Sequence, residues 1–134
     1  MRFIVMGMAT KESEAGPPPK PEAFAAMQKY NEELAKAGVL LAAEGLVPPS
    51  KGARVKFSGD ERTIIDGPFA ESKEVVAGFS IIKAKSLEEA IELVKRAPNV
   101  NPNGEGIVEI RKLMDVEDFG DAFTPNEEIA KVKY

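Results

Sequence analysis

Residues 66–74, near the middle of the chain, combine a predicted tight turn with four charged side chains. They are Asp66, Glu71, Lys73 and Glu74. A carboxylate acts as a general acid or base when its surroundings hold its pKa near the working pH. Asp66 is therefore a candidate catalytic residue, and its structural alternative is a turn cap that accepts a backbone N–H. Glu71 and Lys73 are candidates for holding a polar ligand, or they pair with each other and fix the loop.

Glu109 and Arg111 form a second candidate site. They alternate with aliphatic residues in the run from residue 107 to residue 114. Because side chains on a strand point to alternate faces, Glu109 and Arg111 share one face and Val108 and Ile110 share the other. The charged pair can bind a polar or anionic ligand, or it can form an ion pair within the subunit or across a dimer.

The composition limits the available chemistry to carboxylates, amines, guanidinium groups, hydroxyls and the backbone. The chain has no Cys and no His, which removes thiol chemistry, the imidazole base and most zinc sites. Its net charge is −4 and it has no basic run, so we expect no nucleic acid partner. The acidic residues between 115 and 121 lack the spacing of an EF-hand. No metal and no cofactor are therefore predicted.

No apolar run approaches the roughly 18 residues that are needed to span a bilayer. The apolar residues 2–8 are too few for a signal peptide with its flanks, and they lead into an acidic segment. We therefore expect no membrane partner and a cytoplasmic location.

Hydrophobic spacing and turn residues predict the order strand, helix, strand, hairpin, strand, helix, strand. Pro21 suits a first helical turn and Gly38 suits a helix end, while Ser86 and Glu89 form a capping box. Gly78 lies inside the strongest strand pattern, where a glycine indicates a bend or the close approach of another backbone. The expected ranges are 3–8, 21–37, 39–46, 54–57 with 62–65, 75–82, 87–96 and 107–114.

Without the hairpin this order is βαββαβ, the ferredoxin-like split pattern, so the predicted fold class is α+β with an inserted β-hairpin. Right-handed crossovers place both helices on one face of an antiparallel sheet. We expect one domain of residues 1–114 and an acidic tail of residues 115–134.

The other face of that sheet is expected to be apolar and uncovered. A four-stranded sheet exposes several hundred Å² per face, more than soluble monomers usually leave bare. A homodimer with sheet packed on sheet would cover it and form a dimeric α/β barrel. Phe119 and Phe123 make the tail a candidate for packing on that second subunit, or for docking a different protein.

The central residues and their surroundings resemble a known family. Asp66-Gly67-Pro68-Phe69-Ala70-Glu71-Ser72-Lys73-Glu74, followed by Gly78-Phe79, is similar to the signature of the DGPF group of YCII-related proteins. Other parts of the chain are also similar to this group, and the Pro-rich loop 16–19 is the part that matches least. The matching segments are 38–46, 88–90, 97–98, 106–111, 118–120 and 124–125.

The resemblance implies a dimeric α+β barrel with a cleft on the barrel side of each sheet. Some YCII relatives carry a His-Asp pair there that is thought to be catalytic, and one is a small lyase that acts on a chlorinated aromatic ring. Asp66 corresponds to that acid, but this chain has no His to accompany it. Many DGPF members are encoded beside extracytoplasmic-function sigma factors, which implies a possible regulatory role.

Three functions are compatible with these patterns. The first is a dimer that binds a small polar molecule in the barrel cleft. The second is a cofactor-free lyase or isomerase that uses Asp66 together with Arg111 or Lys73. The third is a regulatory protein whose tail docks a partner, such as a sigma factor.

Overall fold

A computed structural model describes residues 1–10, 20–67, 74–101, 104–122, 129 and 131–132. The elements in chain order are β1 (Arg2–Thr10), α2 (Pro21–Lys36), β2 (Leu40–Gly45), the 3-10 turn η1 (Pro49–Lys51), β3 (Ala53–Ser58), β4 (Glu61–Asp66), β5 (Glu74–Lys83), α3 (Leu87–Lys95), β6 (Ile107–Lys112) and the 3-10 segment η2 (Val116–Ala122).

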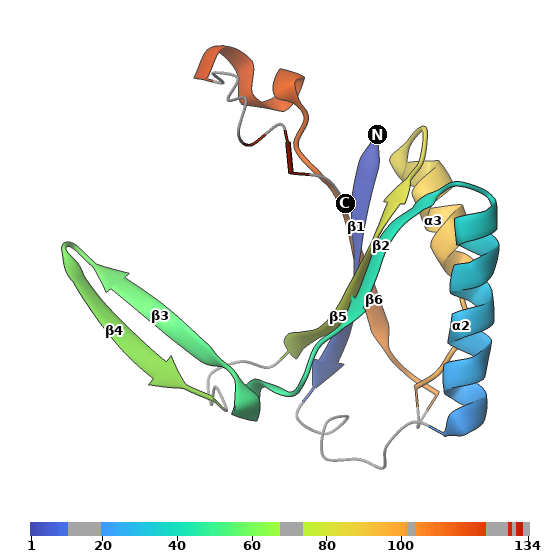
Figure 1. The fold of residues 1–134 in the computed structure, drawn as a ribbon, viewed down its shortest axis with the longest axis horizontal. Coiled ribbons are helices and arrows are strands. Elements are labelled where there is room, and N and C mark those ends of the chain that lie inside the picture. The colour runs from blue at the N-terminus through green and yellow to red at the C-terminus, as the bar shows by residue number, and fades with distance from the viewer. Residues whose placement is uncertain (11–19, 68–73, 102–103, 123–128, 130, 133–134) are drawn as a thin grey trace.

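Four strands form one sheet in the order β2-β5-β1-β6. Every pair of neighbours in this sheet is antiparallel. Both helices cover the same face of the sheet (Figure 1). The predicted α+β, ferredoxin-like arrangement is therefore confirmed, while the pairing of two such sheets into a barrel stays a prediction.

The ends of the helices follow local sequence signals. Pro21 occupies the first turn of α2, and Gly38 beyond its end has a φ of 75°, which a glycine adopts without strain. Ser86 caps α3, because its Oγ accepts the Glu89 N–H at 3.2 Å. In the predicted capping box, the Glu89 side chain would accept the Ser86 N–H. In the structure Glu89 Oε1 instead accepts the N–H of the preceding residue, Lys85, at 3.4 Å.

The hydrophobic core lies between the sheet and the helices. Its centre is Phe3, Leu34, Ile82, Ala84 and Ala90, all buried. Tyr30 packs against this cluster, and its hydroxyl donates a hydrogen bond to the Leu93 carbonyl at 2.8 Å. None of the described helices is long and apolar enough to cross a membrane.

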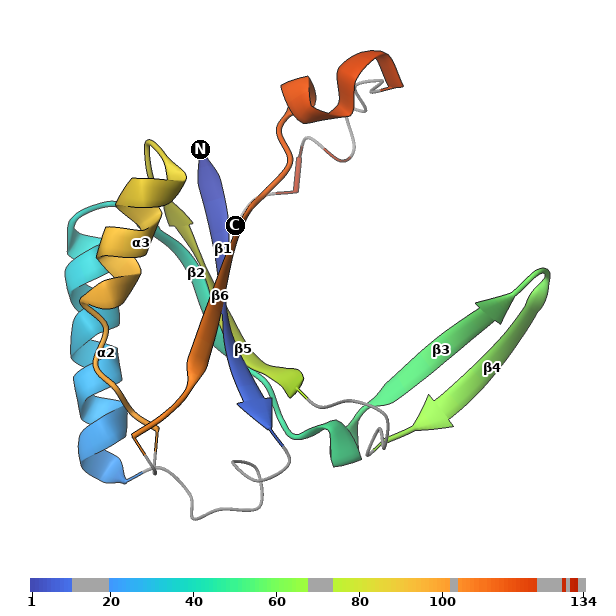
Figure 2. The same ribbon diagram turned by 180° about the vertical axis from the view of Figure 1, so that it is seen from behind.

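The predicted hairpin is confirmed, but it is not part of the main sheet. Strands β3 and β4 form a separate two-stranded sheet, which we call the arm (residues 53–66). It projects from the side of the main sheet opposite the helices, as does η2 (Figures 1 and 2). Gly59, at the turn, has a φ of 58°, the glycine position of a type II′ turn. Every residue of both arm strands is exposed.

The start of the acidic tail is anchored to the end of β6. Lys112 Nζ lies 2.6 Å from Asp118 Oδ2 and 3.3 Å from Asp115 Oδ2. The Asp115 N–H also donates to Asp118 Oδ2, at 2.8 Å. Gly120, with a φ of 60°, bends the segment between two short 3-10 turns. Phe123, predicted to pack on a partner, lies outside the described residues.

Candidate functional site

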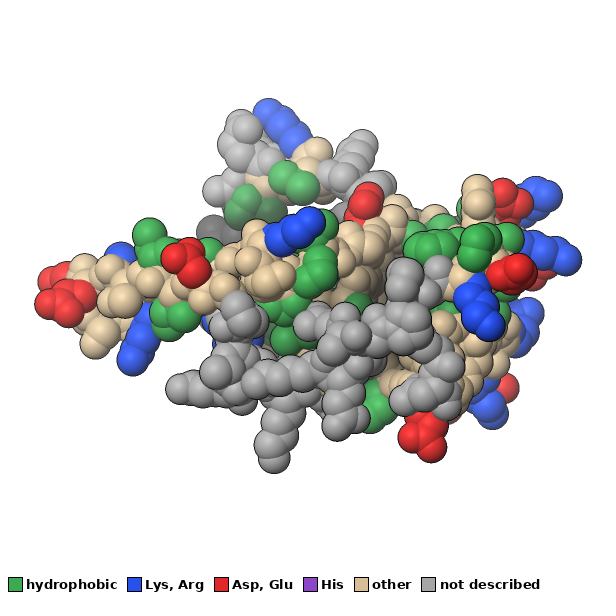
Figure 3. Space-filling view, turned by 90° about the horizontal axis from the view of Figure 1, so that it is seen from below, with side chains coloured by type: hydrophobic (Ala, Val, Ile, Leu, Met, Phe, Trp, Pro, Cys, Tyr) green, Lys and Arg blue, Asp and Glu red, His purple; other side chains and the backbone are tan. Residues whose placement is uncertain are grey.

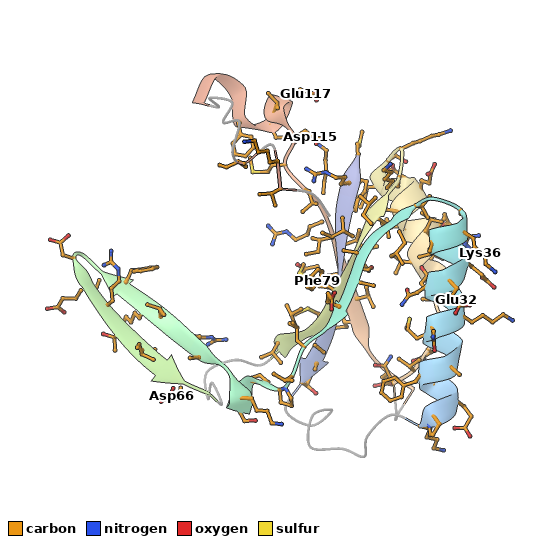
Figure 4. All side chains as sticks on the ribbon, viewed as in Figure 1. Glu32, Lys36, Asp66, Phe79, Asp115 and Glu117 are labelled. Atoms are coloured by element: carbon orange, nitrogen blue, oxygen red, sulfur yellow. The ribbon has the colours of Figure 1, made fainter. Side chains whose placement is uncertain are left out.

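Asp66 is the last residue of β4 and pairs with Ala53 at the base of the arm (Figure 4). Its side chain is exposed. The next residue is held tightly, because the Gly67 N–H donates to the Gly52 carbonyl at 3.1 Å. A Cβ at Gly67 would overlap the Pro49 carbonyl oxygen. The Asp-Gly pair of the motif therefore fits a turn packed against η1, where the second residue must be glycine.

Of the other charged residues of the motif, Glu74 begins β5 and pairs with Thr10. Glu71 and Lys73 lie outside the described residues, so their proposed ligand contacts stay predictions. Within the described part of the chain, no hydrogen bond or ion pair joins Asp66 to Glu109 or Arg111. Among the described candidates, Asp66 ends β4 of the arm, whereas Glu109 and Arg111 lie on β6 of the main sheet.

Glu109 and Arg111 lie on the uncovered face of the sheet, as their alternation predicted. Glu109 pairs with Met6 and Arg111 pairs with Ile4 across the β1–β6 ladder. The intervening Ile110 packs against the core on the helix side. Both charged side chains are exposed, and within the described residues neither forms an ion pair.

The uncovered face, which we call the open face, is mainly apolar. Phe79 pairs with Met6 near the middle of the sheet (Figure 4). Ile81, which pairs with Ile4, is only 3% exposed although it lies outside the helix-side core cluster. The arm and η2 flank this face (Figure 1). The residues of the open face include Ile4, Met6, Met8, Ala42, Glu44, Val76, Phe79, Ile81, Ile107, Glu109 and Arg111.

A cavity of about 440 Å³ lies on the other side of the sheet, beneath the helices. Its lining includes Met27, Tyr30 and Asn31 of α2 and three glycines of the sheet: Gly7, Gly45 and Gly78. The predicted close approach at Gly78 is confirmed, since a Cβ there would lie 3.0 Å from the Glu44 carbonyl oxygen. The cavity itself was not predicted from the sequence. Glycines inside three separate apolar strand patterns were the available signal.

Among the described residues that line this cavity, Tyr30 is the one whose pKa is clearly shifted. Burial raises the pKa of Tyr30, and the positive charge of Arg96 opposes part of that rise. The hydroxyl therefore stays protonated at neutral pH and keeps its hydrogen bond to Leu93. It can still accept one further hydrogen bond, because a phenol oxygen is both donor and acceptor.

The antiparallel order β2-β5-β1-β6 with both helices on one face defines a ferredoxin-like α+β domain. This chain belongs to the YCII-related family, whose domain matches residues 1–117. It is also similar to an uncharacterised protein of Rhizobium meliloti (strain 1021). The identity is 39% over 89 residues, which cover 66% of this chain and 68% of that protein. Neither match specifies a reaction.

Proposed function

We propose that this protein is a homodimer that binds a small polar molecule where two open faces meet. The observation that carries the proposal is the composition of the open face, which is apolar at Met6 and Phe79 and charged at Glu109 and Arg111. A two-fold interface brings the same patch of both subunits together. A face that carries both signs of charge beside an apolar centre suits such self-pairing.

The polar ligand follows from the requirement that buried charges be paired. Packing a second sheet over Glu109 and Arg111 removes water from both groups, and an unpaired charge in such an interface is costly. Each group then pairs with the second subunit or with a ligand. A guanidinium presents a planar fork of donors that fits a carboxylate. A small molecule with a carboxylate is therefore the ligand class that Arg111 favours.

The two halves of the proposal have separate tests. A light-scattering mass at micromolar concentration should give a dimer, and a monomer would contradict the interface. Thermal unfolding against a panel of small carboxylates should show at least one stabilising compound, because a ligand that binds only the native state raises its stability. Arg111→Gln should abolish that shift, whereas Lys56→Gln on the exposed arm should keep it. A dimer that no compound stabilises would remove the ligand half alone.

A second candidate function is catalysis by Asp66, as in a cofactor-free lyase or isomerase. It is favoured by the fixed backbone at this residue, which the tight packing of Gly67 against Pro49 provides. Rigid placement is what a catalytic carboxylate requires. If Asp66 is the acid or base, Asp66→Asn should abolish turnover and leave the unfolding temperature unchanged. Full turnover in that variant would exclude the role.

A third candidate is a regulatory protein that docks a partner, such as a sigma factor, through its tail. It is favoured by the exposed apolar side chains of Val116 and Phe119 in η2, which are 60% and 42% exposed. A chain that lacks residues 115–134 should then keep its dimer mass and lose the partner. Retention of the partner by the shortened chain would reject this function.

A further inference from the structure

The space between α2 and the sheet is filled by core side chains near Leu34 and is open near Met27. The inward-facing residues of α2 are Met27, Tyr30, Asn31 and Leu34, spaced at three and four positions. Leu34 is 5% exposed and packs in the core cluster. Towards Met27 the helix instead roofs the cavity of about 440 Å³. Cavities of this size, within the range of about 300–1,000 Å³, accommodate small organic ligands.

A row of three glycines forms the floor of this cavity. Gly78 on β5 pairs with Gly7 on β1 and with Gly45 on β2. Directly paired residues of an antiparallel ladder lie on the same face. Gly7 shares its face with Val5, which packs against the helix-side core. The three glycines therefore remove side chains from one continuous strip of the sheet below α2.

The fold itself requires only one of these glycines. Gly78 is needed because a Cβ would crowd the Glu44 carbonyl. A Cβ at Gly45 would meet no atom within 4 Å, and one at Gly7 would meet only the Gly78 oxygen at 3.9 Å. Neither Gly7 nor Gly45 has a positive φ. Since glycine weakens a strand interior, these two positions keep space open at a cost in stability.

The cavity wall is apolar with a few neutral polar groups. Val5, Ile82 and Val94 are among its aliphatic lining residues. Glu44 also lines it, but its pairing with Phe79 puts its side chain on the open face. Among the residues that the structure describes, no other lining residue carries a charge. The neutral polar side chains are Tyr30, Asn31 and Ser80.

We propose that this glycine-floored cavity binds a neutral, mainly apolar molecule that carries one hydroxyl or carbonyl group. The apolar part lies over Gly7 and Gly45, and the polar group hydrogen-bonds to Tyr30 or Asn31. A charged group is disfavoured, because no described lining residue offers an opposite charge to a buried anion, and Arg96, whose charge acts on Tyr30, does not line the cavity. This site is separate from the polar site proposed on the open face, and either can exist without the other.

Binding can be measured with N-phenylnaphthylamine, a neutral probe that fluoresces in apolar surroundings. We expect saturable fluorescence with the wild-type protein. Decanol should displace the probe, and decanoate, which has the same chain length and a negative charge, should not. Equal displacement by decanoate would overturn the neutral character of the site, and the absence of saturable fluorescence would overturn the site.

Substitutions at the glycines of the cavity floor test whether the probe binds in the cavity. Gly7→Val and Gly45→Val place a side chain into the cavity and should weaken probe binding by about tenfold or more. Gly45→Ala is the milder variant if valine prevents folding. Gly52→Ala is the matched control, because its Cβ would make only an ordinary contact with Pro49, at 3.6 Å, away from the cavity. Unchanged affinity in folded floor variants would overturn the proposal.

Arg111→Gln separates this site from the one on the open face. The substitution should leave probe affinity unchanged while it removes any carboxylate-induced stabilisation. If Arg111→Gln lowered the affinity for the probe as much as the floor variants do, the probe would be binding at the open face. The separate cavity site would then be rejected.

Discussion

At the scale of single residues, four glycines occupy positions where the presence or absence of a Cβ matters most to the local structure. Gly67 and Gly78 are each packed against a carbonyl from another element, of Pro49 and Glu44 respectively. Gly7 and Gly45 have room above them. The same residue type therefore serves close packing at two positions and open space at two others.

Gly67→Ala should destabilise the protein, because its Cβ would overlap the Pro49 carbonyl, which is backbone and cannot rotate away. Overpacking of this kind costs about 1–3 kcal/mol. Urea unfolding of the variant measures the loss. Gly52→Ala, which faces the same carbonyl at 3.6 Å, should change the free energy of unfolding by less than about 0.5 kcal/mol. Equal effects of the two substitutions would contradict the tight contact.

Gly7→Ala should stabilise the ligand-free protein by about 0.5–1 kcal/mol, because alanine is the better strand residue and its methyl group has space. Gly78→Ala should not, since its methyl group would lie 3.0 Å from the Glu44 carbonyl oxygen. The difference between the two variants in denaturant unfolding tests whether the space above Gly7 is real. A destabilised Gly7→Ala would show that it is filled.

Only some of these residue contacts were predictable from the sequence. The tight approach at Gly78 was predictable because glycine in a strong strand pattern has few other causes. The contact between Gly67 and Pro49 was not, because it depends on how η1 packs in three dimensions. Asp66 was correctly placed beside a turn, since it ends β4 and is followed by Gly67, whose N–H donates to the Gly52 carbonyl.

At the scale of elements, turn and cap residues made the helices and hairpin predictable. The separation of the arm from the main sheet was not. Alternation in β3 and β4 shows that one face is apolar, with Val55 opposite Ile64, but it does not say which sheet the strands join. Figure 3 shows hydrophobic side chains on the surface of the arm between its charged groups.

The contact between Lys112 of β6 and Asp118 of η2 should be lost at both acid and alkaline pH. The hydrogen bond from Lys112 lowers the pKa of Asp118, and the same bond raises the pKa of Lys112. The contact is therefore complete above the ordinary aspartate pKa of 3.8 and is lost as pH falls through the lowered value. On the alkaline side it is complete below 10.5 and is lost above that, through the raised value.

The Asp115 amide reports this anchor, because it donates to Asp118 Oδ2. Its NMR chemical shift should titrate with a midpoint below 3.8. In Lys112→Gln the midpoint should rise, since the neutral amide no longer stabilises the carboxylate. An unchanged midpoint would mean that Lys112 does not hold Asp118 in solution.

At the scale of the whole molecule, the strand order and the helix layer were predictable, and the cavity was not. The reason is a β-bulge. The register of β2 with β5 shifts between Leu40 and Ala42, so Gly45 faces the helices on the same side as Leu40. Strict alternation from Leu40 would have put Gly45 on the opposite face. A bulge cannot be located from hydrophobic spacing alone.

The proposed dimer predicts a strong effect of charge at the centre of the open face. Met6→Glu places a carboxylate between two apolar surfaces, where an unpaired charge costs several kcal/mol. Light scattering should then show a monomer at micromolar concentration. Thr63→Glu, on the exposed arm, should remain dimeric. A dimeric Met6→Glu protein would place the interface elsewhere.

The position of β1 also has a consequence for how the chain is made. Among the described strands it comes first in the chain, yet it lies inside the sheet between β5 and β6. Its partner β6 (Ile107–Lys112) is the last of the described strands to be synthesised. Contacts so distant in sequence form slowly because they require long loops to close. During synthesis the backbone N–H and C=O groups of β1 that pair with β6 therefore stay unpaired until β6 is made, whereas the arm, whose two strands are consecutive, can form first.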